Sequence, residues 1–196
     1  ATPASPPLIA LYILTGGLIE AQLNKAYASI FTNLPSTGTY TILASDSYDG
    51  DDTGNYALFI QRTFDPGNDS LINYGQTISS TVDTDGDFDT FTFNGTAGDS
   101  VILVMTEKSY SPAQEPLIRL YNPAGGLIES QFDNGQATIF TNLPSTGLYT
   151  ILAGNNYDGD GTGDCAVSIQ RTFNPGNDST IQCGHTSSKS LNTNGN

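Results

Sequence analysis

The stretch QRTFDPGNDS at residues 61–70 returns as QRTFNPGNDS at residues 170–179. It closes a longer repeat, in which residues 7–70 recur as residues 116–179 at a constant offset of 109. The two copies are identical at 43 of their 64 paired positions. A repeat of this length is typical of a tandem array of modules, each long enough to bury a core of its own.

Short segments inside each copy alternate apolar and polar side chains. Tyr40, Ile42 and Ala44 share one face of such a segment, and Val101 and Leu103 share a face of another. A period of two indicates β-strands, and the clusters of Gly, Asn, Asp and Pro between the segments indicate turns. The sequence therefore predicts an all-β fold, built of tandem antiparallel β-sandwich (jelly-roll) modules with a 109-residue repeat.

Two Pro-Gly turns, at residues 65–67 and 174–176, follow the last strong strand of each copy and mark the module boundaries. We expect residues 1–66 to form a partial β-sandwich module that lacks its first strands. Residues 67–175 are expected to form a complete module, and residues 176–196 the opening strand of a next one. This last segment is expected to complete a neighbouring subunit, unless the chain is a window of a longer array.

The charge of the chain restricts its partners. Twenty acidic and six basic residues give a formal net charge of −14. Nucleic acid and anionic membranes are thereby disfavoured as partners, because both require Lys and Arg to neutralise phosphates. No apolar run is long enough to predict a membrane-spanning helix. Few basic residues and many Gly, Ser, Thr, Asn and Asp residues favour an extracellular or cell-surface protein.

Four landmarks follow one another along residues 67–173. They are Asn-Asp-Ser at 68–70, DGDFDTFTF at 85–93, AGDSV at 97–101 and LPSTGLYT at 143–150. In this order the landmarks resemble those of the bacterial pre-peptidase C-terminal (PPC) family. Members are jelly-roll modules found in secreted proteases, collagen-binding modules and surface repeat proteins. The resemblance implies a β-sandwich, an extracellular location and no catalytic activity.

The same resemblance implies a Ca²⁺ site. Collagen-binding relatives join the opening Asn-Asp to the Asp-rich turn around Ca²⁺, a cation that prefers oxygen ligands. Carried over, the metal site comprises Asn68, Asp69, Asp85, Asp87 and Asp89. A Tyr of the family's site falls on Cys165 here, which is a departure from the pattern. The alternative interpretation of these residues is a solvated acidic turn.

The two cysteines stand at related positions. Cys165 replaces Tyr56 of the preceding copy, and Cys183 replaces Tyr74. Two such changes together predict that the positions touch and that a Cys165–Cys183 disulfide links one module to the next. The alternatives are two free buried thiols or cross-links between chains.

Three sites fit the Asn-x-Ser/Thr acceptor pattern for N-linked glycans, which makes glycans candidate partners. They are Asn68, Asn94 and Asn177. Asn94 lies in an expected turn and is the better acceptor.

Catalysis is not expected. Gly98-Asp99-Ser100 resembles the nucleophile block of one lipase and esterase class, which also needs an Asp three residues before a His. The only histidine is His185, and Gln182 stands three residues before it. We therefore predict a non-enzymatic structural module of an extracellular repeat array or fibre, assembling head to tail with other copies of itself by strand complementation. The alternative is an accessory module of a secreted enzyme that binds collagen or polysaccharide.

Overall fold

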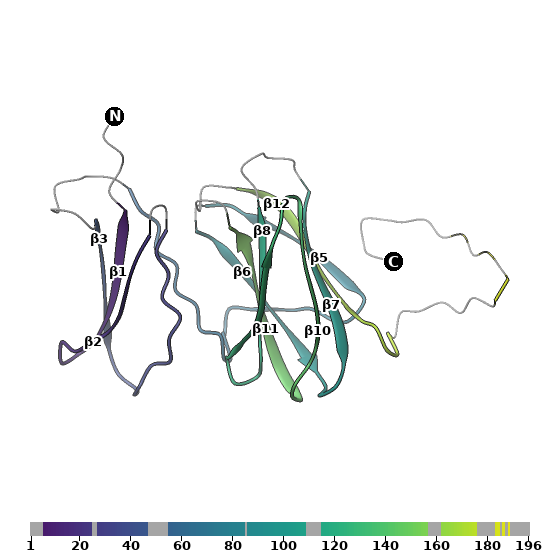
Figure 1. Cartoon of the computed structure of the whole chain (residues 1–196), viewed down its shortest axis with the longest axis horizontal. Coiled ribbons are helices and arrows are strands. Elements are labelled where there is room, and N and C mark those ends of the chain that lie inside the picture. Colours follow the sequence, from purple (N-terminus) through teal and green to yellow (C-terminus); the bar gives the residue numbers. More distant parts are fainter. Residues whose placement is uncertain are drawn as a thin grey trace. The chain divides into compact units, whose positions relative to one another are not determined.

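The computed structural model describes residues 6–24, 27–46, 55–84, 86–108, 115–156 and 162–175, together with residues 183, 184, 186 and 188. These residues contain twelve β-strands and no helix. The chain divides into two compact units, Ala1–Tyr56 and Ala57–Asn196 (Figure 1).

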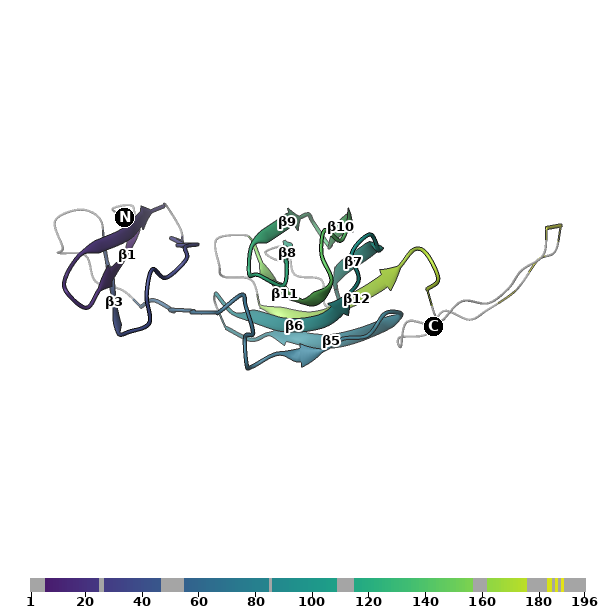
Figure 2. The same ribbon diagram turned by 90° about the horizontal axis from the view of Figure 1, so that it is seen from below.

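The second unit consists of two sheets (Figure 2). The five-stranded sheet has the order β4-β6-β11-β8-β9, and the four-stranded sheet has the order β10-β7-β12-β5. All neighbouring strands are antiparallel except β4 and β6. The bounds are β4 (Ser70–Leu71), β5 (Gln76–Val82), β6 (Phe88–Gly95), β7 (Ser100–Glu107), β8 (Pro116–Tyr121), β9 (Leu127–Phe132), β10 (Gln136–Asn142), β11 (Gly147–Asn155) and β12 (Gly163–Arg171).

One hydrophobic core joins the two sheets. Phe93 and Ile151 enter it from the five-stranded sheet, and Leu103, Val167 and Ile169 enter it from the other. Each is exposed by 3% or less, so each contributes about 1.5–3 kcal/mol through the loss of apolar surface from water. The predicted all-β fold with antiparallel sandwich sheets is confirmed.

The first unit contains a three-stranded sheet of order β2-β1-β3, with β1 (Pro7–Ile13), β2 (Leu18–Leu23) and β3 (Tyr40–Asp46). Its register equals that of β9-β8-β11 at the offset of 109. Leu8 pairs with Leu23 and Ser45, as Leu117 pairs with Phe132 and Gly154. The irregularity between residues 11 and 12 recurs between residues 120 and 121.

Two segments of the first copy do not take the structure of their counterparts. Residues 27–33 correspond to β10 and residues 54–62 to β12, yet the described residues among them form no strand. In the second unit β10 pairs with β7 alone, and β12 lies between β7 and β5. Counterparts of β5 and β7 are absent from the described part of the first unit. The 109-residue period of the sequence is thus reproduced only in part by the structure.

The segment that was expected to close the first module packs on the second unit. The Thr63 hydroxyl donates a hydrogen bond of 2.9 Å to the carbonyl of Gly125. The ring of Phe59 lies 5.3 Å from that of Phe88, and both residues belong to the second unit. Nearly all of residues 176–196 lie outside the described residues, so the expected role of this segment stays a prediction.

Candidate functional site

The predicted Ca²⁺ ligands Asp69 and Asp89 are held by different neighbours. Asp69 accepts a hydrogen bond from the Thr92 hydroxyl, and Asp89 accepts one of 2.6 Å from Ser80. Residues 89 and 92 are three apart on β6, so their side chains point to opposite faces of the sheet. Asp69 and Asp89 therefore lie on opposite faces too.

Two other predicted ligands, Asn68 and Asp87, form hydrogen bonds with different residues. Asn68 exchanges hydrogen bonds of 3.0 and 3.2 Å with Gln61, and Asp87 accepts one of 3.3 Å from the Asp83 backbone. Asp85 lies outside the described residues. No group of three His, Cys, Asp or Glu side chains suited to a metal occurs among the described residues. The Ca²⁺ site stays a prediction.

Burial is the largest cause of a raised pKa at Asp89, and the charges of Asp87 and Asp83 raise it further. The hydrogen bond from Ser80 opposes this shift, because it stabilises the carboxylate. A cation bound here would remove the repulsion among these three carboxylates, which gives the Ca²⁺ prediction a measurable consequence.

The predicted disulfide does not form in the structure, where Cys165 and Cys183 are both free thiols. Cys165 points from β12 into the hydrophobic core, whereas Cys183 is exposed in a turn. The predicted disulfide requires the Cys165 side chain to reach the next module, but this side chain is enclosed in the core of its own module. Burial, followed by the charges of Asp89 and Asp164, raises the pKa of the Cys165 thiol to about 11, so the thiol is protonated and unreactive at neutral pH.

The candidate glycan acceptors differ in their surroundings. Asn94 is exposed near the end of β6. Asn68 is exposed but hydrogen-bonded to Gln61, and Asn177 lies outside the described residues. Asn94 remains the better acceptor, and all three sites stay predictions.

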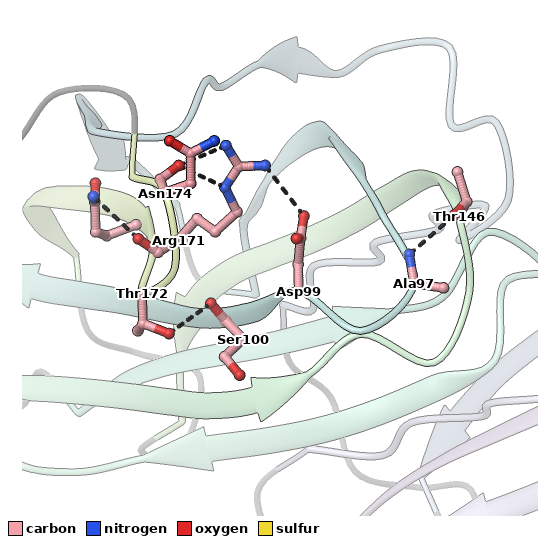
Figure 3. A network of polar contacts seen from close by, with 8 residues as sticks. Ala97, Asp99, Ser100, Thr146, Arg171, Thr172 and Asn174 are labelled. Atoms are coloured by element: carbon pink, nitrogen blue, oxygen red, sulfur yellow. Dashed lines mark hydrogen bonds and ion pairs between the residues drawn. The ribbon is translucent and has the colours of Figure 1, made fainter.

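Asp99 and Ser100 belong to a polar network at one end of the four-stranded sheet (Figure 3). The Asp99 carboxylate and the Arg171 guanidinium are 3.6 Å apart, and Arg171 donates hydrogen bonds of 2.6 and 3.0 Å to the Asn174 carbonyl. The Thr172 amide donates one of 2.9 Å to the Ser100 carbonyl. These contacts tie the end of β12 to the start of β7, and His185 lies outside the described residues.

The first copy keeps the local part of this network. Arg62 donates to the Asp65 carbonyl as Arg171 donates to that of Asn174. Asp65 and Asn174 both adopt positive φ angles, of 44° and 50°. What Arg62 lacks in the described first copy is a counterpart of Asp99, which stands at the start of β7.

The most distinctive feature is a set of segments in the first copy. Their counterparts in the second copy have strand neighbours that these segments lack among the described residues. β11 lies between β8 and β6, whereas β3 pairs with β1 and with no other described strand. Ile151 is fully buried, and its counterpart Ile42 is partly exposed. Ile169 on β12 is 1% exposed, and its counterpart Ile60 is 76% exposed.

No helix in the described residues has the length and apolar character required to cross a bilayer. No family model matches the chain, and no curated protein matches it. Several solved structures do.

One is the pre-peptidase C-terminal domain of a collagenase from Bacillus anthracis, with 15% identity and a TM-score of 0.44 over 52% of this chain and 93% of that domain. Another is PliG from Aeromonas hydrophila, a periplasmic inhibitor of g-type lysozyme, with 18% identity and a TM-score of 0.39 over 52% of this chain and 95% of that one. A third is CorA of Methylomicrobium album BG8, a surface-associated copper-binding protein, with 11% identity and a TM-score of 0.41 over 52% of this chain and 96% of that one. These likenesses include a domain of the family that the sequence landmarks resemble. Identities and TM-scores this low carry no conclusion about family membership, ligands or activity.

Proposed function

We propose that the chain is a non-enzymatic structural module of an extracellular repeat array or fibre, in which a partial sandwich is completed by strands of a neighbouring copy. One observation carries this proposal. Residues 27–33 and 136–142 share the sequence IFTN, yet only the second segment, which lies beside β7, is a strand. In the described residues, the first copy therefore has the sequence of a sandwich but only part of the strand pairing of its counterpart.

Addition of a strand from another chain can supply the strand neighbours that the first copy lacks among the described residues. An open strand edge presents unpaired N–H and C=O groups, and an extended segment of another chain can bind to them. A contact between two different surfaces of one chain builds a filament when its rotation does not close a ring. We propose such a head-to-tail contact, with other copies of this chain as the partners.

The C-terminal residues 176–196 supply part of the donor. They correspond to residues 67–87, which contain the sequences of β4 and β5 in the second unit. In the proposed contact this tail completes the first unit of the next copy. Secretion, with a glycan on the exposed Asn94, fits the net charge of −14 and the acceptor pattern.

Electron microscopy of the purified full chain, over a range of protein concentrations, tests the proposal. We expect filaments with an axial repeat of one or two modules. A variant that ends at residue 175 is the matched control, because it keeps the whole described sandwich and loses the tail; it should give no filaments. Monodisperse particles that bind collagen or a polysaccharide would instead support an accessory binding module.

A further inference from the structure

We infer that the outer face of the five-stranded sheet is a docking surface for residues 57–66, the closing segment of the first copy, and that this contact couples one module of an array to the next. Residues 57–66 are called the strap below. The inference rests on the proposed function for the array, whereas the surface and the strap both belong to the second unit.

The outer face of this sheet is covered. Side chains of a strand point alternately to the two faces of its sheet, and Phe91 on β6 and Ile151 on β11 point into the core. Their neighbours Thr90 and Leu152 therefore point outwards, as does Tyr121 on β8. All three are exposed by 7% or less. Because the outer face of an antiparallel sandwich commonly meets water, a further layer of chain covers it here.

Two contacts hold the strap across this face. The Phe59 ring lies 5.3 Å from the ring of Phe88, at the start of β6. The Thr63 hydroxyl donates a hydrogen bond of 2.9 Å to the carbonyl of Gly125, in the turn after β8. β6 and β8 are both antiparallel to β11, so the start of β6 and the end of β8 lie at opposite ends of the sheet. The strap between the two contacts therefore crosses the outer face.

The strap does not use the side chains that its counterpart buries. Ile169 of β12 belongs to the core, whereas Ile60 of the strap is largely exposed. The anchoring ring of Phe59 stands instead at the position of Ser168 in β12. Phe59 is thus an anchor that the first-copy segment has and the second-copy segment lacks.

The strap is held less firmly than a strand of the sheet. Among the described residues it forms no strand pairing, and it leaves the hydroxyls of Thr90 and Tyr121 buried without a hydrogen-bond partner. Buried hydroxyls without a partner weaken the contact that buries them. Burial also raises the pKa of Tyr121. The strap is therefore a layer that can bind and leave as a unit.

A cut chain tests the inference. A recognition sequence for a specific protease is inserted between Pro66 and Gly67, where Gly67 is exposed. The full chain is folded first and cleaved afterwards, so that residues 1–66 and 67–196 are no longer joined covalently. Size-exclusion chromatography and a dilution series then measure whether the two fragments stay together.

We expect the fragments to migrate as one complex. Phe59→Ser, which gives the strap the residue of β12, should weaken this complex about tenfold, because it removes the aromatic contact with Phe88. Ile60→Ser alters an exposed neighbour and is the matched control, with a change of less than about twofold. Fragments that separate at once, or equal effects of the two substitutions, would overturn the inference.

The uncut chain gives a second measurement. Nitration of Tyr121, followed at this site by mass spectrometry, reports how often the strap opens. Phe59→Ser should accelerate it about tenfold over the parent chain, because the open population grows as binding weakens. An unchanged rate would contradict the strap as the cover of this face.

Docking and filament formation can fail separately. Filaments from a chain whose strap does not bind would leave the proposed fibre standing and remove the strap as its coupling contact. Strap binding without filaments would keep the docking surface and remove the array.

Discussion

β3 and β11 share the sequence YTILA but lie in different surroundings. β11 is the central strand of a five-stranded sheet, and Tyr149, Ile151 and Ala153 are completely buried. β3 is the edge of a three-stranded sheet, and its counterpart side chains are partly exposed. The difference teaches that the neighbours of a segment, and not its own residues, decide here whether it belongs to a core.

Interactions between residues close in the sequence are the same in both copies, unlike the pairing of strands. The turn NLPSTG places a tyrosine hydroxyl on the carbonyl of a serine four residues earlier in both copies. The positive φ angles of Gly16 and Gly125 also agree, at 86° and 83°. Interactions that span a few residues form in both copies, whereas strands that depend on β5 or β7 form in one.

The largest expected effect comes from a matched pair of core substitutions. Ile151→Ala should lower the free energy of unfolding of the second unit by about 2–5 kcal/mol, because it leaves a cavity in a closed core. Ile42→Ala should cost less than about 1 kcal/mol, because Ile42 is already partly hydrated. Chemical denaturation of both variants measures the difference, and equal costs would show that the first unit has a closed core after all.

Alkaline pH should lower the stability of the second unit, which contains buried groups with raised pKa values. The folded-state pKa of Cys165 is raised from about 9 to about 11, and that of Tyr74 is raised to about 12, mainly by burial. Groups with raised folded pKa values contribute stability that is complete below their unfolded values and is lost as the pH rises through the folded ones. The second unit should therefore lose stability between about pH 9 and pH 12, which thermal unfolding at several pH values can follow.

Cys165→Ala is the control for this effect. It removes the thiol that must ionise, so the loss of stability between about pH 9 and pH 11 should become smaller than in the parent chain. An unchanged pH profile would assign the alkaline loss to other groups.

The buried tyrosine hydroxyl gives a smaller effect. Tyr149→Phe removes its hydrogen bond to Ser145 in a buried position and should cost about 1 kcal/mol. Tyr40→Phe removes the same bond from a partly exposed ring and should cost a few tenths of that, since water replaces the partner. Equilibrium denaturation of both variants measures the two costs, and a larger cost at Tyr40 would contradict the account.

Calcium should have the smallest effect and should act on the second unit alone, where the predicted ligands lie. At millimolar Ca²⁺ and the millimolar affinity typical of extracellular modules, the gain is about 0.4–1 kcal/mol. Thermal unfolding with Ca²⁺ and with chelator measures it. Mg²⁺ at the same ionic strength is the control, and identical unfolding in all three conditions would remove the predicted site.

The sequence predicted the fold class because alternation and turn residues are local signals. It placed the strand at residues 40–44 correctly. It could not predict that residues 57–66 pack on the second unit, since that choice depends on partner strands far away in the sequence.

The candidate sites were harder to predict for geometric reasons. The resemblance to the PPC family implied that Asp69 and Asp89 meet, but the pleat of β6 sends Asp89 and Thr92, the partner of Asp69, to opposite faces. The paired change of two tyrosines to Cys165 and Cys183 suggested a contact. It does not reveal that the side chain at position 165 points inwards.

The central claim is that partner strands, and not local sequence, decide whether the first-copy segments become strands. Hydrogen exchange of the dilute, unassembled chain tests it most directly. We predict that amides of residues 136–142 exchange at least a hundredfold more slowly than those of residues 27–33. A chain in which residues 67–115 are repeated ahead of residue 7 should give both segments similar protection. Equal protection in the parent chain, or no gain in the extended one, would contradict the account.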